Sequence, residues 1–544
     1  METYYFRDYR KTDDVGYDLY TMLKTLHGKQ GVRIVFDPDT YEVYPDSCFE
    51  RTLFISNHGW NGPKRMAVLV EDMQDVELDF SGSILRVHGP MTHMGILRSR
   101  NVCVKNLILE NPRTQIMQGN VIAHGENYIE LRMTHGAEQF RQRHQELVTD
   151  YKGGVFFNIW IHQEYNGKTG EFIGDFPLGI NICDTKVEDL GDGRIRIYDV
   201  KRVPPIGNIL ILNATRRLGC GIFCENSSEI RCENITVRSC MGMGFAAQLC
   251  ENIILSGFHT RLHDGRAFTA NADATHFVAC RGKVVVENSV FECQLDDALN
   301  IHGMYTRVAK KSSHEILVQE MHEEAKGIRF FRQGDKVQIL KPDSLIPYTE
   351  KTIVDLEYIN SDMVRLVLAE ETDDIVVGDH AENVTCTAEL VFRGNTVRHN
   401  RARGILIASK GKTVIEENHF YSPSVAIQME ANGEYWYESG GTNDLTIRNN
   451  TFENSSYAAP DAPVINCVPR KTVEPGKYFH KNIVVTGNRF IMAEQAQTLA
   501  AFDNVQHAVF EDNTVQTKDG LEPKVTVHHV AGVDLQDGVE RIDK

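Results

Sequence analysis

The sequence predicts an all-β protein built as a right-handed parallel β-helix, and two observations carry the prediction. The first is a repeated motif, apolar-x-x-Asn-x-apolar, which separates short strands of alternating polarity. Its copies lie at residues 285–290, 392–397, 415–420, 447–452, 485–490 and 510–515. The second is a tighter echo, in which Cys232-Glu233-Asn234-Ile235 matches Cys250-Glu251-Asn252-Ile253. Self-similarity at a period of roughly 20 to 30 residues, with strands this short, is typical of a β-solenoid.

The motif also predicts how such coils pack. Alternating side chains of a strand point to opposite faces, so the Val, Ile and Phe residues of each coil face inward. The asparagine occupies the turn, where amide side chains of successive coils can stack into a hydrogen-bonded ladder.

A short helix is predicted to cap the first coil. Asp13 and Asp14 offer an N-cap, and residues 19–26 place Leu and Met at helical spacing before Gly28. A strand follows at residues 31–36. A cap is needed because the open end of a solenoid exposes unpaired strand edges.

Two stretches lack the asparagine motif, and we expect each to be an inserted small β-barrel-like domain. The first insertion opens with a short charged helical segment, and both contain strands at the spacing of antiparallel barrels. The predicted divisions are a capped N-terminal β-helix (1–139), the first insertion (140–218), central coils (219–303), the second insertion (304–389) and C-terminal coils with a tail (390–544). The second insertion follows the polar cluster directly, so we expect it to form one wall of a pocket.

Composition limits the partners. The chain has 58 Lys and Arg against 75 Asp and Glu, a net charge of −17, which argues against a nucleic acid or an anionic membrane. No apolar run approaches the roughly 20 residues that span a bilayer. The first residues lack a signal-peptide pattern, so we expect a cytoplasmic protein, with a trimmed exported form as the alternative. The twelve cysteines look like reduced core residues. The sequence leaves open whether the protein is a homo-oligomer.

One polar cluster stands out within residues 264–303. Asp273 is followed 23 and 24 residues later by Asp296 and Asp297. Because one coil of a solenoid spans about this distance, the three carboxylates are predicted to lie side by side on one face. The alternative is that the Asp pair only stabilises a turn.

The segments Asn271-Ala272-Asp273-Ala274-Thr275-His276 and Asp296-Asp297-Ala298-Leu299-Asn300-Ile301-His302-Gly303 resemble the family 110 glycoside hydrolases, which are exo-acting α-1,3-galactosidases. More distantly they are similar to the polygalacturonases, where an Asp is followed about one coil later by an Asp-Asp pair. The resemblance implies hydrolysis with inversion and without a cofactor. The analogy implies that Asp296 is the acid and that Asp273 and Asp297 activate water.

The chemistry supports this interpretation independently. Inverting hydrolysis of a glycoside needs an acid for the leaving oxygen and a base that activates water. Clustered carboxylates disfavour simultaneous ionisation, so one can stay protonated near neutral pH while its neighbours act as bases.

Further candidates for substrate binding surround the cluster. His276, His302 and Asn271 lie in the two motifs, and Asp264 with Arg266 precedes them. Each has a structural alternative, a hydrogen bond beside a strand for the histidines and a surface ion pair for Asp264 and Arg266. For Arg403, at a coil corner, we expect a solvated face, with a position that reaches the pocket as the alternative.

An aromatic cluster at residues 430–440 also breaks the repeat. Trp436 could cover the apolar face of a galactose ring, and Glu438 could grip two hydroxyls or serve as a reserve acid. The alternative is a packed loop. No metal-binding pattern is evident, so we expect no metal. The rival functions are a polysaccharide lyase, a polygalacturonase-like hydrolase and a non-catalytic glycan-binding β-helix.

Overall fold

The fold was analysed in a computed structural model of the 544-residue chain. The structure describes residues 1–59, 61–136, 140–143, 146–151, 155–158, 160–175, 186–200, 202–213, 217–468, 472–518 and 520–544. Within these residues no helix is long and apolar enough to cross a membrane.

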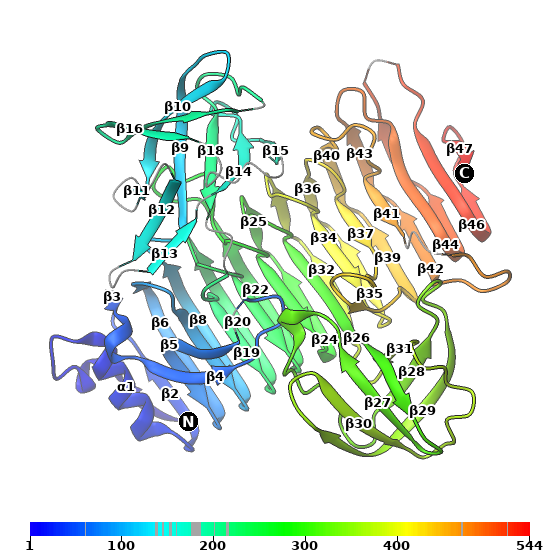
Figure 1. The fold of residues 1–544 in the computed structure, drawn as a ribbon, viewed down its shortest axis with the longest axis horizontal. Helices are drawn as coiled ribbons and strands as arrows, with labels where there is room; N and C mark the ends of the chain where they lie inside the picture. Colours follow the sequence, from blue (N-terminus) through cyan, green and yellow to red (C-terminus); the bar gives the residue numbers. More distant parts are fainter. Residues whose placement is uncertain are drawn as a thin grey trace.

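The body of the molecule is a parallel β-helix, confirming the predicted fold class (Figure 1). One of its faces, called here the site sheet, is a continuous row of parallel strands that pair coil to coil. In spatial order these are β5 (Gly62–Glu71), β7 (Thr92–Leu97), β19 (Ile222–Glu225), β21 (Phe245–Gln248), β23 (Thr275–Val278), β26 (Leu299–Lys311), β34 (Ile405–Ala408), β37 (Ile427–Met429), β41 (Ile465–Cys467), β44 (Thr498–Glu511) and β46 (Lys524–Leu535).

Two further rows complete the coils. The longer row contains β2 (Gln30–Val35), β6 (Gln74–Val87), β8 (Arg100–Glu110), β20 (Ser228–Val237), β22 (Glu251–Thr260), β24 (Arg281–Glu287), β32 (Ala388–Arg393), β35 (Thr413–Glu416), β39 (Asp444–Arg448) and β42 (His480–Thr486). The shorter row contains β25 (Val290–Glu292), β33 (Thr396–Arg398), β36 (His419–Tyr421), β40 (Thr451–Ser455), β43 (Arg489–Met492) and β45 (Thr514–Gln516). The last strand, β47 (Glu540–Asp543), pairs with β46.

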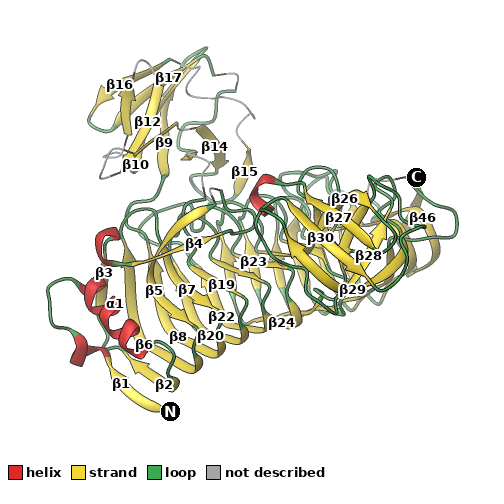
Figure 2. Ribbon diagram, turned by 60° about the horizontal axis from the view of Figure 1, so that its bottom comes forward, coloured by secondary structure: helices red, strands yellow, loops and turns green. Residues whose placement is uncertain are grey.

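The N-terminal cap forms as predicted (Figure 2). Helix α1 (Val15–Leu26) begins after Asp14, whose carboxylate accepts a hydrogen bond from the amide of Tyr17 at 3.0 Å. Its apolar side packs on the first coils beside β3 (Thr40–Val43) and β5. The remaining N-terminal elements are β1 (Glu2–Tyr5), η1 (Phe6–Tyr9), η2 (Pro45–Ser47) and β4 (Phe49–Leu53). The cap therefore covers the open edge of the solenoid.

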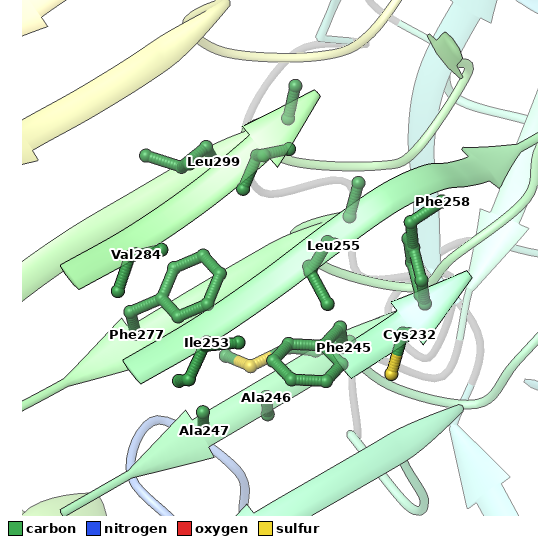
Figure 3. Close-up of a cluster of buried hydrophobic side chains, with 14 of the residues drawn as sticks. Cys232, Phe245, Ala246, Ala247, Ile253, Leu255, Phe258, Phe277, Val284 and Leu299 are labelled. Atoms are coloured by element: carbon green, nitrogen blue, oxygen red, sulfur yellow. The ribbon is translucent and has the colours of Figure 1, made fainter. Parts of the chain in front are cut away.

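The solenoid interior is filled by stacked apolar side chains. Phe245 and Phe277, on neighbouring coils of the site sheet, have ring centroids 5.7 Å apart and pack beside Leu299 (Figure 3). The eleven cysteines in the described residues are all unpaired, and most are buried. Four of them, Cys232, Cys250, Cys280 and Cys293, are at most 3% exposed, so the prediction that they are core residues is confirmed.

The asparagine ladder forms over the C-terminal coils. In each rung, the Oδ1 atom of the asparagine accepts a hydrogen bond, 2.9 to 3.0 Å long, from the backbone amide of the ladder residue in the preceding coil. The accepting residues are Asn395, Asn418, Asn450, Asn488 and Asn513. The motif at 285–290 departs from the expectation, because Ser289 holds the ladder position. Asn288 instead sits in a left-handed turn with φ 52°. The sequence motif there is offset by one residue from the structural repeat.

The first insertion starts earlier than predicted. Strands β9 (Ile116–His124) and β10 (Tyr128–His135) leave the solenoid and join a seven-stranded antiparallel sheet, so residues 116–135 belong to the insertion. That sheet also contains β14 (Trp160–Tyr165), β15 (Phe172–Asp175), β16 (Val187–Gly191), β17 (Arg194–Tyr198) and β18 (Ile209–Asn213).

The expected helical opening of this insertion is wrong. That stretch forms β11 (Phe140–Arg143) and β12 (Glu146–Tyr151), which pair with β13 (Val155–Asn158) in a three-stranded sheet. The charged residues there can alternate along strands as readily as they can line a helix, so the pattern did not decide between the two.

The second insertion is a closed antiparallel barrel. The far half of β26 pairs with β27 (Glu315–Glu320), and the circuit continues through β30 (Met363–Leu368), β29 (Pro347–Tyr358), β28 (Lys336–Leu340) and β31 (His380–Asn383) back to β26. A single turn of helix, η5 (Glu323–Ala325), lies between β27 and β28. Because β26 belongs to both the solenoid and the barrel, the barrel begins directly beside the polar cluster.

Candidate active site

A pocket of about 290 Å³ opens on the site sheet where the predicted cluster lies. The residues around it come from the coils, from the loop after β4 and from the loop before β38 (Glu438–Ser439). They are Asn57, Arg217, Asp273, His276, Asp296, Asp297, Asn300, Arg401, Arg403, Leu406, Glu430, Asn432, Trp436 and Glu438.

The coil register brings the three aspartates together. The turns before β23, β26 and β34 stack on one another, with the amide of Ala274 bonded to the carbonyl of Asp297 at 2.8 Å. The amide of Asp297 in turn donates to Asp273 Oδ1 at 3.3 Å. Carboxylate oxygens of Asp273, Asp296 and Asp297 lie within 4.8 Å of one another. The predicted proximity, inferred from a separation of one coil, is confirmed.

Asp297 is held by an arginine from the next coil. Its Oδ1 accepts the backbone amide of Arg403 at 2.9 Å and its Oδ2 accepts the guanidinium at 2.6 Å. Burial raises the pKa of Asp297, the guanidinium opposes that rise, and the other two aspartates add to it. The expectation that Arg403 lies on a solvated face is wrong, because a carboxylate as buried as Asp297 requires a paired cation.

Asp296 is the most accessible of the three carboxyl groups. Its side chain is 19% exposed, against 5% for Asp273 and 1% for Asp297. Arg217 approaches it at 3.3 Å and Arg401 at 3.8 Å. Arg401 also forms a two-pronged ion pair with Asp175 of the first insertion, at 2.8 and 3.1 Å. The first insertion is thereby tied to the rim of the pocket.

Asp273 begins a chain of hydrogen bonds that leads away from the pocket. Its Oδ2 lies 2.5 Å from His276 Nδ1, His276 Nε2 lies 3.0 Å from His302 Nε2, and His302 Nδ1 lies 2.6 Å from the carbonyl of Gly303. A carbonyl only accepts, so His302 donates through Nδ1, and when its ring is neutral it accepts through Nε2. His276 then donates through Nε2 and accepts through Nδ1. The chain is complete when Asp273 is protonated and donates to His276.

The electrostatics agree with that proton position. Burial raises the pKa of Asp273 to about 8, and the negative charge of Asp296 adds to the rise. Burial also lowers the pKa of His276 well below its usual range, and nearby His302 adds to this effect. Asp273 contacts His276 and the backbone amide of Asp297, and both of these groups are neutral. Asp297, by contrast, contacts a guanidinium. Of these two buried carboxyls, Asp273 is therefore the one that keeps the proton near neutral pH.

Glu438 faces the trio from the opposite wall. Asn57 and Asn300 both donate to its Oε1, at 2.9 and 3.5 Å. Burial acts to raise the pKa of Glu438, but His302, His276, Arg403 and the Asn57 hydrogen bond outweigh it and leave the pKa below its usual range. An ionised Glu438 fits the predicted grip on hydroxyls and does not fit the reserve role of acid.

Trp436, predicted to cover a sugar ring, lines the pocket. Its side chain is 38% exposed and its ring centroid lies 5.1 Å from His322 and 4.9 Å from Tyr435. The second insertion acts differently from the expectation, since the residues that line the pocket do not include any of its described strands. Instead it supports the wall, because β38 pairs with β26 and His322 contacts Trp436.

Four predicted substrate-binding residues lie outside the pocket lining, namely His302 behind His276 and the three residues Asp264, Arg266 and Asn271. Asp264 is exposed in a left-handed turn and its carbonyl accepts from His135 at 2.7 Å. Arg266 donates to the carbonyls of Asn111 and Pro112, and Asn271 accepts from Asn213 of β18. These contacts fix the coil and the first insertion, and they arise because residues 264–271 form the turn before the pocket rather than its floor.

Sequence reasoning missed Asn57, Arg217 and Arg401 in the pocket. None lies in a motif, and each reaches the site from a segment remote in sequence. The one available signal was charge, because three clustered carboxylates require nearby cations. With three guanidinium groups already facing the aspartates, their oxygens could bridge a metal ion only in competition with these arginines.

Comparison with known proteins identifies the family of this chain. Residues 378–538 match the right-handed β-helix region, and residues 315–380 match the GLAA-B β-barrel domain II. The α-1,3-galactosidase B of Phocaeicola vulgatus is 30% identical over 91% of this chain and 88% of its own length. The chain belongs to the α-1,3-galactosidase family of glycoside hydrolases.

Other relatives and solved structures complete the comparison. The α-1,3-galactosidase B of Bacteroides fragilis is 29% identical over 91% of this chain and 87% of its own length. The α-1,3-galactosidase A of Shewanella woodyi is 28% identical over 85% of this chain and 76% of its own length. Among solved structures, the family 28 exopolygalacturonase of Yersinia enterocolitica superposes with a TM-score of 0.40 at 10% identity, over 100% of this chain and 78% of that one. The predicted resemblance is confirmed, and the substrate is a carbohydrate.

Proposed function

We propose that this galactosidase releases single terminal α-1,3-linked galactose residues and does so with inversion, using Asp273, Asp296 and Asp297. The observation that carries the proposal is the carboxyl trio on the floor of a small pocket, where burial raises the pKa of Asp273 to about 8. A volume of about 290 Å³ is at the low end for small-molecule sites, which suits one terminal sugar rather than the interior of a polymer.

In this mechanism the trio shares one proton. Asp273 stores it in the free enzyme, and Asp296, the most exposed carboxyl, passes it to the leaving oxygen. The oxygens lie within 4.8 Å of one another, so one bridging water is enough for the transfer. As the glycosidic bond breaks, Asp273 and Asp297, now both anionic, activate a water for attack on the anomeric carbon. The proton of that water returns to Asp273, and the starting state is restored.

The remaining pocket residues would hold the galactose ring. Trp436 covers its apolar face, and the ionised Glu438 accepts from hydroxyl groups. Two buried polar atoms in the described pocket have no hydrogen-bond partner, Asn300 Oδ1 and Arg403 Nε. A buried polar atom without a partner is costly, so sugar hydroxyls that pair with both atoms would be favoured.

The test is NMR of galactosyl-α-1,3-galactose incubated with the wild type and with Asp273→Asn, Asp296→Asn and Asp297→Asn. We expect β-galactose as the first product of the wild type and a loss of about 100-fold or more in each variant. Asp264→Asn is the matched control, since Asp264 is exposed and lies outside the pocket lining. First release of α-galactose would refute inversion, and unchanged rates in the variants would refute the roles of the trio.

The same assay identifies the acceptor. A linear α-1,3-galactosyl oligosaccharide and a fucosylated, branched one of the blood group B type would be compared at equal concentration. We propose that the linear form is accepted. Release from the branched form alone would assign the enzyme to that acceptor instead.

A further inference from the structure

A second hollow, larger than the pocket, lies on the same face of the solenoid. It is a groove of about 700 Å³ on the C-terminal coils, and its floor contains Gln428, Asn466, Ala501 and Thr526. None of the candidate residues of the pocket lies in it.

The strand register joins the two hollows into one track. On the site sheet His276 pairs with Asn300 and Asn300 with Leu406, and these three residues belong to the pocket. Leu406 pairs with Gln428, the first residue of the groove floor.

The same row continues through the groove. Gln428 pairs with Asn466, Asn466 with Ala501 and Ala501 with Thr526. No rung separates pocket from groove. At a strand spacing of roughly 4.8 Å, the groove floor from Gln428 to Thr526 is about 14 Å long.

Hydrogen bonds also cross the junction. Glu430, which lines the pocket, accepts from the Gln428 amide, and Asn466 donates to Gln428 Oε1 at 3.2 Å. Beyond these amides, Ala501 has only a methyl side chain and leaves room above the floor. The track therefore passes from the pocket rim into an open groove that is lined by both polar and apolar residues.

The lining chemistry fits a neutral sugar chain. Gln428 and Asn466 carry both donors and acceptors, as sugar hydroxyls require. Two carboxylates line the groove, and one of them, Asp503, is paired with His528 at 2.8 Å. With a single lysine in the described lining, the groove offers little to a polyanion.

We propose that this groove is an acceptor site, which binds the remainder of a linear, neutral oligosaccharide whose terminal galactose occupies the pocket. The inference rests on the proposed function for the position of the galactose. It adds that the enzyme recognises several sugars beyond the bond that it cleaves, and that its preferred substrates are extended chains rather than disaccharides.

The test variant is Ala501→Trp, which fills the groove. The control is Thr446→Trp, because Thr446 faces outward on β39 and lines neither hollow. Substrates are galactosyl-α-1,3-galactose and a linear pentasaccharide with the same terminal linkage on a neutral tetrasaccharide. We expect the wild type and Thr446→Trp to prefer the pentasaccharide about tenfold or more in kcat/KM, the effect of two hydrogen bonds to neutral groups. In Ala501→Trp the preference disappears while kcat/KM for the disaccharide is unchanged.

A binding measurement separates this inference from the proposed function. The tetrasaccharide without its galactose is titrated into each protein and followed by calorimetry, which needs no turnover. Binding to the wild type that weakens about tenfold in Ala501→Trp supports the groove even if no galactose is released from any substrate. Equal kcat/KM for both substrates in the wild type, or tetrasaccharide binding that survives Ala501→Trp, would overturn the inference.

Discussion

The protonation of Asp273 predicts how stability depends on pH. Its pKa is raised from 3.8 to about 8 in the folded protein, so between these values the folded state binds one proton more than the unfolded state. Stability from this group is fully present below the unfolded pKa and is lost as pH rises toward 8. The slope is about 1.4 kcal/mol per pH unit, or about 2.7 kcal/mol between pH 5 and pH 7.

Asp273→Asn removes this dependence, because the amide is neutral at every pH and can still donate to His276. With an unfolding entropy of about 2.1 cal/mol/K per residue, 2.7 kcal/mol corresponds to roughly 2 to 3 °C for a chain of this length. Scanning calorimetry from pH 5 to pH 7 should therefore show the Tm of the wild type falling by that amount relative to the variant. Asp264→Asn should follow the wild type. Parallel curves for wild type and Asp273→Asn would refute the assignment of the proton to Asp273.

Three further changes test other parts of the structure. Arg403→Met should reduce kcat about 100-fold or more, and it should destabilise the protein by up to about 3 to 5 kcal/mol in denaturant unfolding, because it leaves Asp297 buried without its cation. A stable, active variant would contradict that pairing. Trp436→Ala should lower kcat/KM for galactosyl-α-1,3-galactose by about tenfold without changing Tm, and an unchanged kcat/KM would remove the ring from the substrate site. Asn450→Ala should lower the free energy of unfolding by about 1 to 3 kcal/mol for each buried backbone group that it leaves unpaired, because Asn450 bonds the amide of Asn418 and the carbonyl of Ile415. Urea unfolding measures this loss, and a loss below about 1 kcal/mol would refute the role of the ladder.

The sequence predicted the solenoid well because its determinants are local and repeated. Each asparagine motif marks one turn, and the alternation of apolar residues marks the inward face. The motif failed at Asn288, because the ladder position lies one residue later at Ser289, whose Oγ accepts the amide of Phe258 at 3.0 Å. The start of the first insertion was missed because only the antiparallel partners of β9 distinguish it from a solenoid strand.

The residues of the candidate site could likewise be predicted only in part. Asp273, Asp296, Asp297 and His276 could be predicted, since one coil of sequence brings them together. Arg217 could not, because nothing local to its segment indicates that it reaches Asp296, 79 residues away. The same holds for other contacts between loops of different coils.

The pocket is assembled from segments made at very different times. Asn57 and Glu438, joined by a hydrogen bond across it, are 381 residues apart in the chain. At ribosomal speeds of about 5 to 20 residues per second, Glu438 is synthesised on the order of 20 to 80 s after Asn57. During that interval the early coils can stack in order of synthesis, but the growing end of the β-helix stays an open edge that other strands could join. The nascent chain therefore has no complete pocket until the closed barrel and the loop behind it have been made. Activity therefore appears only late in synthesis. The risk of aggregation is greatest while the edge of the growing β-helix is exposed.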